Sequence, residues 1–214
     1  MFSADGPGSA IVLPASAGYA DRVRTAFKEW AIVADALGRG EQIIVLRKGG
    51  ISEQGGGFQV DHPEFLIFPT HYHQQRESVL PAAQARYDTL APAFPSPERL
   101  RLEWFARVVD WRRLDSRQAA LRLAGQHIWR EEVIAERFDW GREKAIHALA
   151  LRMHRLPAPV ELPMLESYGG CKSWVQLAVD VDVGGARPVL GESDFQARLA
   201  AFRRALDAEP VPFA

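Results

Sequence analysis

Cysteine is almost absent from this chain of 214 residues, which contains only Cys171. An internal disulfide framework is therefore excluded, and a single thiol fits a reducing compartment. An excess of one charge is also missing, since 26 Lys and Arg oppose 27 Asp and Glu, for a formal net charge of −1. This balance argues against a general polyanion binder, whose affinity comes mainly from excess Lys and Arg, but it allows a local basic patch.

Long apolar runs are lacking too. No stretch approaches the roughly 20 apolar residues that a membrane-spanning helix requires, and the apolar run at residues 10–13 is too short for the core of a signal peptide. These absences predict a cytoplasmic protein with no membrane partner. The rest of the composition, 47% hydrophobic and 25% charged, is ordinary for a soluble globular protein that buries a sizeable core.

The chain divides into three parts by composition. Residues 1–18 are rich in Gly, Ala, Ser and Pro and predict a flexible N-terminal arm. Residues 19–208 are expected to form a single α+β domain, followed by a tail over residues 209–214. The order of the predicted helices and strands is irregular, which favours an α+β fold over a doubly wound sheet.

Helical periodicity is clearest at the two ends of the domain. Apolar residues predict a helix over residues 21–37, ended by Gly38 and Gly40. An alternative stays open, in which residues 30–37 and 42–46 pair as a hairpin around these glycines. Further helices are expected over residues 76–90, from the cap Ser116 to 123, over 131–138, and from the capping box of Ser193 and Gln196, with Arg203 and Arg204 on the solvent face of this last helix.

Five strands are predicted, over residues 42–46, 65–68, 100–108, 145–156 and 174–181. The third has the clearest period of two, with apolar and charged side chains alternating. The fourth carries too many apolar residues on both faces for a surface element, so we expect a central strand, ended by Pro157, Pro159 and Pro163.

Three short clusters, far apart in the sequence, carry most of the chemistry. They cover residues 46–51, 68–74 and 168–174. Each mixes glycine or proline with groups that donate hydrogen bonds, carry charge or stack, which is how binding loops on a rigid scaffold are built. Convergence of the three clusters would therefore indicate one binding site.

The first cluster places Arg47 and Lys48 at the end of a predicted buried strand, before Gly49 and Gly50. Glycine lets backbone N–H groups approach an anion or a base edge closely. The planar guanidinium of Arg47 suits phosphate or the edge of guanine. The alternative is a strand end whose basic side chains simply reach solvent.

The second cluster offers Thr70, His73 and Gln74 as hydrogen-bonding candidates. His71 and His73 also have the spacing of metal ligands on an extended strand, but no third ligand is apparent. We therefore favour a histidine that hydrogen-bonds the Thr70 loop, and predict neither a metal site nor a cofactor.

The third cluster contains Cys171, Lys172 and Trp174. The adjacent ammonium group would lower the pKa of the Cys171 thiol, but a nucleophilic cysteine also needs a base, and no histidine can be assigned that role from the sequence. A small buried structural residue is the favoured interpretation. Among six tryptophans, Trp174 and Trp129 lie beside polar loop residues and are the better candidates for stacking a planar ligand.

Five separated motifs together resemble the domain of unknown function 1802 family of prokaryotes. They are Glu29-Trp30, Leu46 to Ile51, Phe68-Pro69-Thr70 with His73-Gln74, His127-Ile128-Trp129, and Tyr168 to Trp174. The match spans roughly Phe27 to Leu177. The family has no established activity. The resemblance implies a genomic link to restriction–modification systems, because relatives can be fused to a restriction-endonuclease-like domain.

A second resemblance concerns the fold. The stretch from Gly40 to Arg47 is similar to the Gly-x-Lys-x-x-Glu-x-Arg hallmark of the ASCH branch of PUA-like barrels, although Gln42 replaces the lysine and Val45 the glutamate. This resemblance implies a PUA-like mixed β-barrel or a strongly curved sheet with flanking helices and a ligand groove. The missing lysine argues against the amidohydrolase chemistry of that branch.

These observations favour a protein that binds a nucleotide or a modified nucleic-acid feature. Arg47 and Lys48 would hold phosphate or a base edge, Thr70 and His73 would add hydrogen bonds, and Trp174 would stack. One alternative is a hydrolase or nuclease accessory enzyme of nucleic-acid metabolism that acts through His73, Cys171 or Lys172. Another is a non-catalytic interaction subunit that binds a protein of a restriction or defence system.

Overall fold

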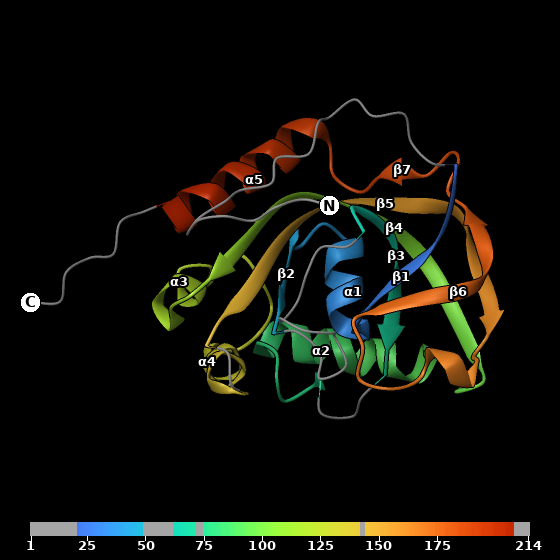
Figure 1. The fold of residues 1–214 in the computed structure, drawn as a ribbon, viewed down its shortest axis with the longest axis horizontal. Helices are drawn as coiled ribbons and strands as arrows, with labels where there is room; N and C mark the ends of the chain where they lie inside the picture. The colour runs from blue at the N-terminus through green and yellow to red at the C-terminus, as the bar shows by residue number, and fades with distance from the viewer. Residues whose placement is uncertain (1–20, 49–61, 72–74, 142–143, 208–214) are drawn as a thin grey trace, which may run out of the picture.

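A strongly curved sheet of seven strands surrounds the first helix (Figure 1). The computed structural model describes residues 21–48, 62–71, 75–141 and 144–207. The predicted arm and tail lie outside these ranges, as do Gly49, Gly50, His73 and Gln74. Within the described residues the strand order is β2-β5-β4-β3-β1-β6, with β7 paired to β5 and no pairing between β2 and β6. The α+β class and the curved sheet are thus confirmed, and the sheet does not close into a barrel.

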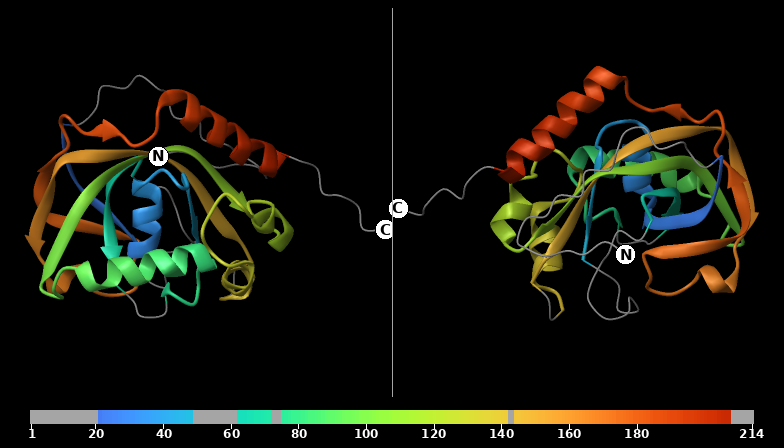
Figure 2. Two further views of the ribbon diagram at one scale, coloured as in Figure 1. Left: turned by 180° about the vertical axis from the view of Figure 1, so that it is seen from behind. Right: turned by 45° about the horizontal axis from the view of Figure 1, so that its top comes forward.

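The strands alternate with helices in an irregular order. The strands are β1 (Arg22–Trp30), β2 (Ile44–Arg47), β3 (Glu64–Thr70), β4 (Arg99–Leu114), β5 (Ile146–Pro163), β6 (Trp174–Asp182) and β7 (Arg187–Pro188). The helices are α1 (Ala31–Gly38), α2 (Pro81–Leu90), α3 (Arg117–Leu121), α4 (Glu131–Asp139) and α5 (Glu192–Asp207), with short 3₁₀ turns η2 (Ala91–Ala93) and η3 (Glu166–Tyr168). In the left view of Figure 2, α5 lies at the top and α2 at the bottom, on opposite sides of the molecule.

The predicted helix over residues 21–37 is wrong in its first half. Residues 22–30 form β1, which pairs with β3 in parallel and with β6 in antiparallel orientation. Apolar clusters cover both faces of this strand, so its apolar residues need not alternate and can imitate a helical spacing. The helix begins only at Ala31 and ends at Gly38, and Gly40 follows with a φ of 67°. The alternative hairpin is wrong as well, because β2 pairs with β5.

The five predicted strands are found where they were expected, but β3, β4 and β5 extend beyond the predicted ends. The strand expected to end before Pro157 continues to Pro163. Pro157 and Pro159 fall where the register shifts between the pairs Trp104–Arg155 and Leu102–Val160. Proline is tolerated there because a bulged residue has no ladder hydrogen bond to lose.

The helices largely follow their predicted signals. Ser116 caps α3, since its Oγ accepts a hydrogen bond from the N–H of Ala119. α5 begins at Glu192, so Ser193 lies inside the helix rather than capping it. Arg203 was placed wrongly on the solvent face, because its Nε donates at 2.7 Å to the fully buried carboxylate of Asp110. In the described part of the chain, no helix is long and apolar enough to cross a membrane.

Two hydrophobic clusters occupy the two faces of the β1–β3 region. Phe27, Phe65 and Ile67 belong to the larger cluster, which also contains most of α1 and the apolar face of α5. Ala26 and Leu66, on the opposite face, belong to the smaller cluster, which includes residues of β6. Neighbouring residues of a strand point to opposite faces, so β1 and β3 are fixed from both sides and their ends are held rigidly.

Candidate ligand-binding site

One cavity of about 330 Å³ brings residues of all three sequence clusters together. Arg47 and Lys48 reach it from the end of β2, Thr70 from the end of β3, and residues 170–173 from the loop before β6. Lys28 to Trp30, at the end of β1, form its base together with the end of α4. The clusters, which are far apart in the sequence, therefore converge at one place.

Positive charge dominates the lining of this cavity. Five basic side chains face one carboxylate, that of Glu29. The basic residues are Lys28, Arg47, Lys48, Arg137 and Lys172. The near-neutral chain thus carries the local basic patch that its composition left open, at a position where an anion would be partly removed from water.

Arg47 connects the first cluster to the third. Its guanidinium lies 4.8 Å from the centroid of the Phe27 ring, and its Nη2 donates to the Oγ of Ser173 at 3.0 Å. Its Nη1 lies 4.0 Å from Oε2 of Glu29. Stacking and a hydrogen bond hold the planar group in one orientation, which suits it to bidentate recognition of an anion.

Two lysines approach each other across the loop before β6. Lys28 Nζ donates to the carbonyl of Gly170 at 3.0 Å, and Lys172 Nζ donates to that of Ser167 at 2.6 Å. Burial lowers the pKa of Lys28 below 10.5, and the positive charges of Lys172 and Arg47 lower it further, against an opposite effect of Cys171. Like charges that disfavour each other in this way are relieved when an anion binds between them.

Arg137 supplies a half-buried cation from α4. Its guanidinium lies 4.4 Å from the ring centroid of Trp30 and 5.4 Å from that of Trp129. Burial lowers its pKa to about 10, against the opposing effect of Glu29, so it remains charged at neutral pH. Lys48 is oriented from the same helix, because its Nζ donates to the carbonyl of Phe138 at 2.8 Å.

Glu29 is a buried carboxylate with 2% exposure. Its Oε1 accepts a hydrogen bond from the N–H of Trp30 at 2.8 Å, while Oε2 accepts none from the described residues. A buried carboxylate is stable only near positive charge. Glu29 therefore acts as a fixed counter-ion that helps to keep Arg47 and Arg137 in place.

Trp30 and Trp140 form the aromatic part of the lining. Trp140 follows α4 directly and is 54% exposed, so one side of its ring is free to stack on a ligand. Trp174 does not line the cavity but packs on Phe27 and Phe65, with ring centroids 4.9 and 5.1 Å apart. Trp129, the other tryptophan expected to stack, is buried in the core with 1% exposure, and that expectation is corrected.

Cys171 is exposed and lines the cavity, so its interpretation as a small buried residue is wrong. Among the described residues no histidine lines the cavity with it.

Thr70 forms two hydrogen bonds at the edge of the cavity. Its side-chain Oγ1 donates to the carbonyl of Glu29 at 3.1 Å, and its own carbonyl accepts from Gln75 Nε2 at 2.6 Å. Thr70 thus fixes the ends of β1 and β3 to each other.

The described residues contain no cluster of three or more metal-ligating side chains. His71 contacts Phe94, with ring centroids 4.2 Å apart and a tilt of 43° between the rings, outside this cavity. Its partner in the predicted His-x-His pair, His73, lies outside the described residues.

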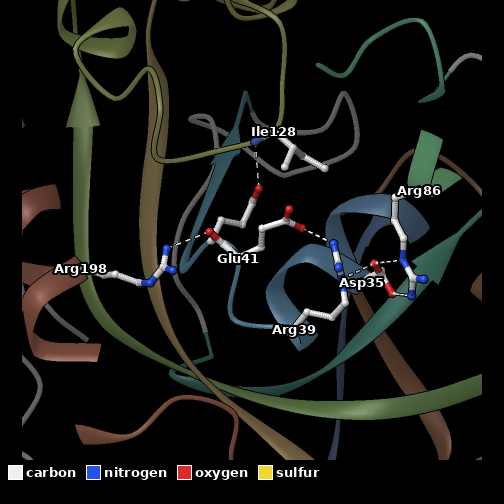
Figure 3. Close-up of polar contacts among 7 residues, drawn as sticks. Asp35, Arg39, Glu41, Arg86, Ile128 and Arg198 are labelled. Atoms are coloured by element: carbon white, nitrogen blue, oxygen red, sulfur yellow. Dashed lines mark hydrogen bonds and ion pairs between the residues drawn. The ribbon is translucent and has the colours of Figure 1, made fainter. Parts of the chain in front are cut away.

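Gln42, which stands where the ASCH hallmark has lysine, has a structural role. It is 1% exposed, its Nε2 donates to the carbonyl of Ile44 at 2.7 Å, and its Oε1 accepts from the N–H of Ile128 at 3.0 Å. Figure 3 shows the bond to Ile128 beside the ion pairs of Asp35 and Glu41, which fix the turn between α1 and β2. The side chain at this position therefore braces β2 instead of reaching a ligand.

Outside the three clusters, sequence reasoning missed five residues of the cavity: Lys28, Glu29, Trp30, Arg137 and Trp140. The first three were assigned to a helix, whereas they lie at the end of a strand. The sequence does contain a signal for Trp140. This residue lies between the end of a helix with a basic last turn and Gly141, and an aromatic ring at such a helix end is expected to be exposed.

Comparison with known proteins identifies the family but no function. The described fold is similar to crystal structures of ASCH proteins from Zymomonas mobilis. A single-residue mutant of the Zymomonas mobilis protein aligns with a TM-score of 0.42 at 12% identity, and the alignment covers 84% of the present chain and 96% of the Zymomonas chain. A further ASCH structure from this organism has a TM-score of 0.40 at 12% identity, covering 82% and 93%. No curated protein matches the chain. The model of the domain of unknown function DUF1802 matches residues 26–201, and the chain belongs to this family.

Proposed function

We propose that the cavity binds one nucleotide, free or as part of a nucleic-acid strand. Lys28, Arg47 and Lys172 hold the phosphate, and the exposed face of Trp140 stacks on the base. The observation that carries the proposal is the convergence of five basic side chains on a small cavity with an exposed tryptophan at its edge.

The size and charge of the cavity narrow the class of ligand. A volume of about 330 Å³ lies at the lower end of the range for small-molecule sites, and it suits one nucleotide rather than a duplex. Guanidinium and ammonium groups recognise phosphate, and a tryptophan face stacks on any base. A small apolar ligand would leave the basic side chains buried without an anion, which costs free energy.

The biological context of the proposal comes from the family resemblance. We propose that the nucleotide belongs to nucleic acid that a restriction or defence system handles, in a cytoplasmic setting, with a restriction-system protein as a further partner. Catalysis is less well supported, because no histidine base lines the described part of the cavity with Cys171.

The test is a binding titration with nucleoside monophosphates and short single-stranded DNA and RNA. Arg47→Ala removes a cation that faces the cavity, whereas Arg204→Ala removes the same charge from the exposed side of α5. We expect Arg47→Ala to weaken binding about tenfold or more, as for the loss of a charge-assisted hydrogen bond, and Arg204→Ala to have little effect. Equal losses in the two variants, or no binding by the unmodified protein, would overturn the proposal.

A further inference from the structure

A second cavity, of about 490 Å³, lies beside the first across the ends of β1 and β3. Trp30 lines the first cavity and Ala31 the second; Thr70 lines the first, and Pro69 and His71 the second. Pro69 and Thr70 are successive residues of β3 and point to opposite sides of the sheet, and the backbone passes from β1 into α1 between Trp30 and Ala31. In both segments, a residue that lines one cavity is followed directly by a residue that lines the other.

Aromatic rings form one wall of the second cavity. His71 and Phe94 lie with ring centroids 4.2 Å apart, and Tyr87 meets Phe94 edge-on at 5.8 Å. Partial desolvation lowers the pKa of His71, so its ring is neutral at neutral pH and can stack or exchange hydrogen bonds with a planar group. Phe94 is half-buried and His71 exposed, which leaves ring surface accessible.

Arginines also line the second cavity, and they differ in whether a carboxylate pairs with them. Arg86 makes a bidentate contact with Asp35 at 3.0 and 2.8 Å, as Figure 3 shows, and Arg101 donates to Glu103 at 2.7 Å. Arg155 is exposed and lies with its guanidinium 4.7 Å from the ring centroid of Trp104. No described acidic residue forms an ion pair with it, so its charge is available to an anion.

We infer that the second cavity holds another nucleotide of the same strand, with its phosphate on Arg155 and its base against Phe94 and His71. The preferred ligand is then a single-stranded oligonucleotide rather than a free mononucleotide, an inference that rests on the proposed function of the first cavity. A strand repeats an anion and a planar ring at every nucleotide, and the lining of each cavity includes both a cation and an accessible ring. Grooves that bind single strands combine these two elements.

The experiment measures affinity against strand length, from one nucleotide to about eight, within the usual span of a single-strand site. We expect the affinity of the unmodified protein to rise once the strand reaches the second cavity. Phe94→Ala should lower the affinity for the longer strands about 5- to 150-fold, the equivalent of one lost stacking contact, and leave mononucleotide binding unchanged. Arg155→Ala should act in the same direction and also reduce the salt dependence.

The matched control is Arg187→Ala, an exposed arginine on β7 that pairs directly with Arg155 in the sheet but does not line the cavity. This variant should keep the full rise in affinity with strand length. A thermal unfolding curve for each variant identifies any loss due to misfolding. Mononucleotide binding without a rise with length, or a rise that survives both Phe94→Ala and Arg155→Ala, would overturn the second subsite and leave the first intact. Absence of all binding would instead remove the proposed function itself.

Discussion

At the scale of single residues, the position of Arg47 at the cavity was predictable and that of Trp140 was not. An arginine at the end of a buried strand, shortly before two glycines, is expected to reach the exposed edge of the sheet because its charge is not readily buried. Trp174 and Trp140 both lie beside polar residues in the sequence, but only the fold decides which ring is covered. Phe27 and Phe65 cover Trp174, because β1 pairs with both β3 and β6 and brings these side chains together.

Trp140 is expected to contribute stacking without charge. Trp140→Ala should weaken nucleotide binding by about 1–3 kcal/mol, the usual contribution of a base–aromatic contact, with no change in salt dependence. Trp140→Phe should keep part of the affinity. Trp174→Ala should instead lower the free energy of unfolding, because this ring packs on two core phenylalanines. If the Trp140→Ala variant binds nucleotide as tightly as the unmodified protein, Trp140 does not stack on the base.

Lys28 gives the site a defined response to pH. In the free protein its pKa lies below 10.5, mainly through burial and then through Lys172 and Arg47. A bound phosphate favours the charged lysine and raises this pKa again, so binding takes up a proton at alkaline pH between the two values. Affinity should accordingly fall as the pH rises through the lowered pKa.

Calorimetric titrations in two buffers with different heats of protonation measure this proton uptake. Lys28→Arg is the control, since arginine stays charged over the whole range and should bind without taking up a proton. The same uptake in Lys28→Arg would assign the titration to another group.

At the scale of elements, the loop before β6 positions the third cluster. Gly170 has a φ of 79°, and its carbonyl accepts the hydrogen bond from Lys28. A Cβ at Gly170 would meet nothing within 4 Å, so the glycine is required by its backbone conformation and not by close approach to a neighbouring segment.

Gly170→Val should cost about 1–3 kcal/mol in strain at this φ, and it should also weaken nucleotide binding by displacing Cys171 and Lys172. Gly170→Asn should be tolerated better, because asparagine adopts the left-handed region more readily than a β-branched residue. Chemical unfolding and a binding titration measure the two effects. A valine variant that matches the asparagine variant in both would show that the loop conformation is unimportant.

Elements whose signals are local were predictable, and those decided by neighbours were not. The cap at Ser116 and the alternating β4 depend on residues next to each other in sequence, and both are found. The first half of the predicted N-terminal helix is β1, because it pairs with β3 and β6 and apolar clusters cover both of its faces. Likewise β5 continues past Pro157 because its partner shifts register there.

At the scale of the whole molecule, a formal net charge of −1 conceals an uneven distribution of charge. Many basic residues form ion pairs with acidic side chains, as Arg112 and Arg203 do with the buried Asp110 that they share. Five others gather around one small cavity. Composition could therefore exclude extended polyanion binding, but only the fold could show that residues from β1, β2, α4 and the loop before β6 share a site.

The salt dependence of binding to a short single strand tests the central claim most directly, because it counts the phosphates that the cavity neutralises. With few basic groups at the site, we predict a shallow decrease of affinity with salt, equal to about two to four phosphates. Arg47→Ala should reduce this number by about one, and Arg204→Ala should leave it unchanged. Undetectable binding at low salt, modified bases included, or an affinity that does not change with salt would contradict a nucleotide site at this cavity.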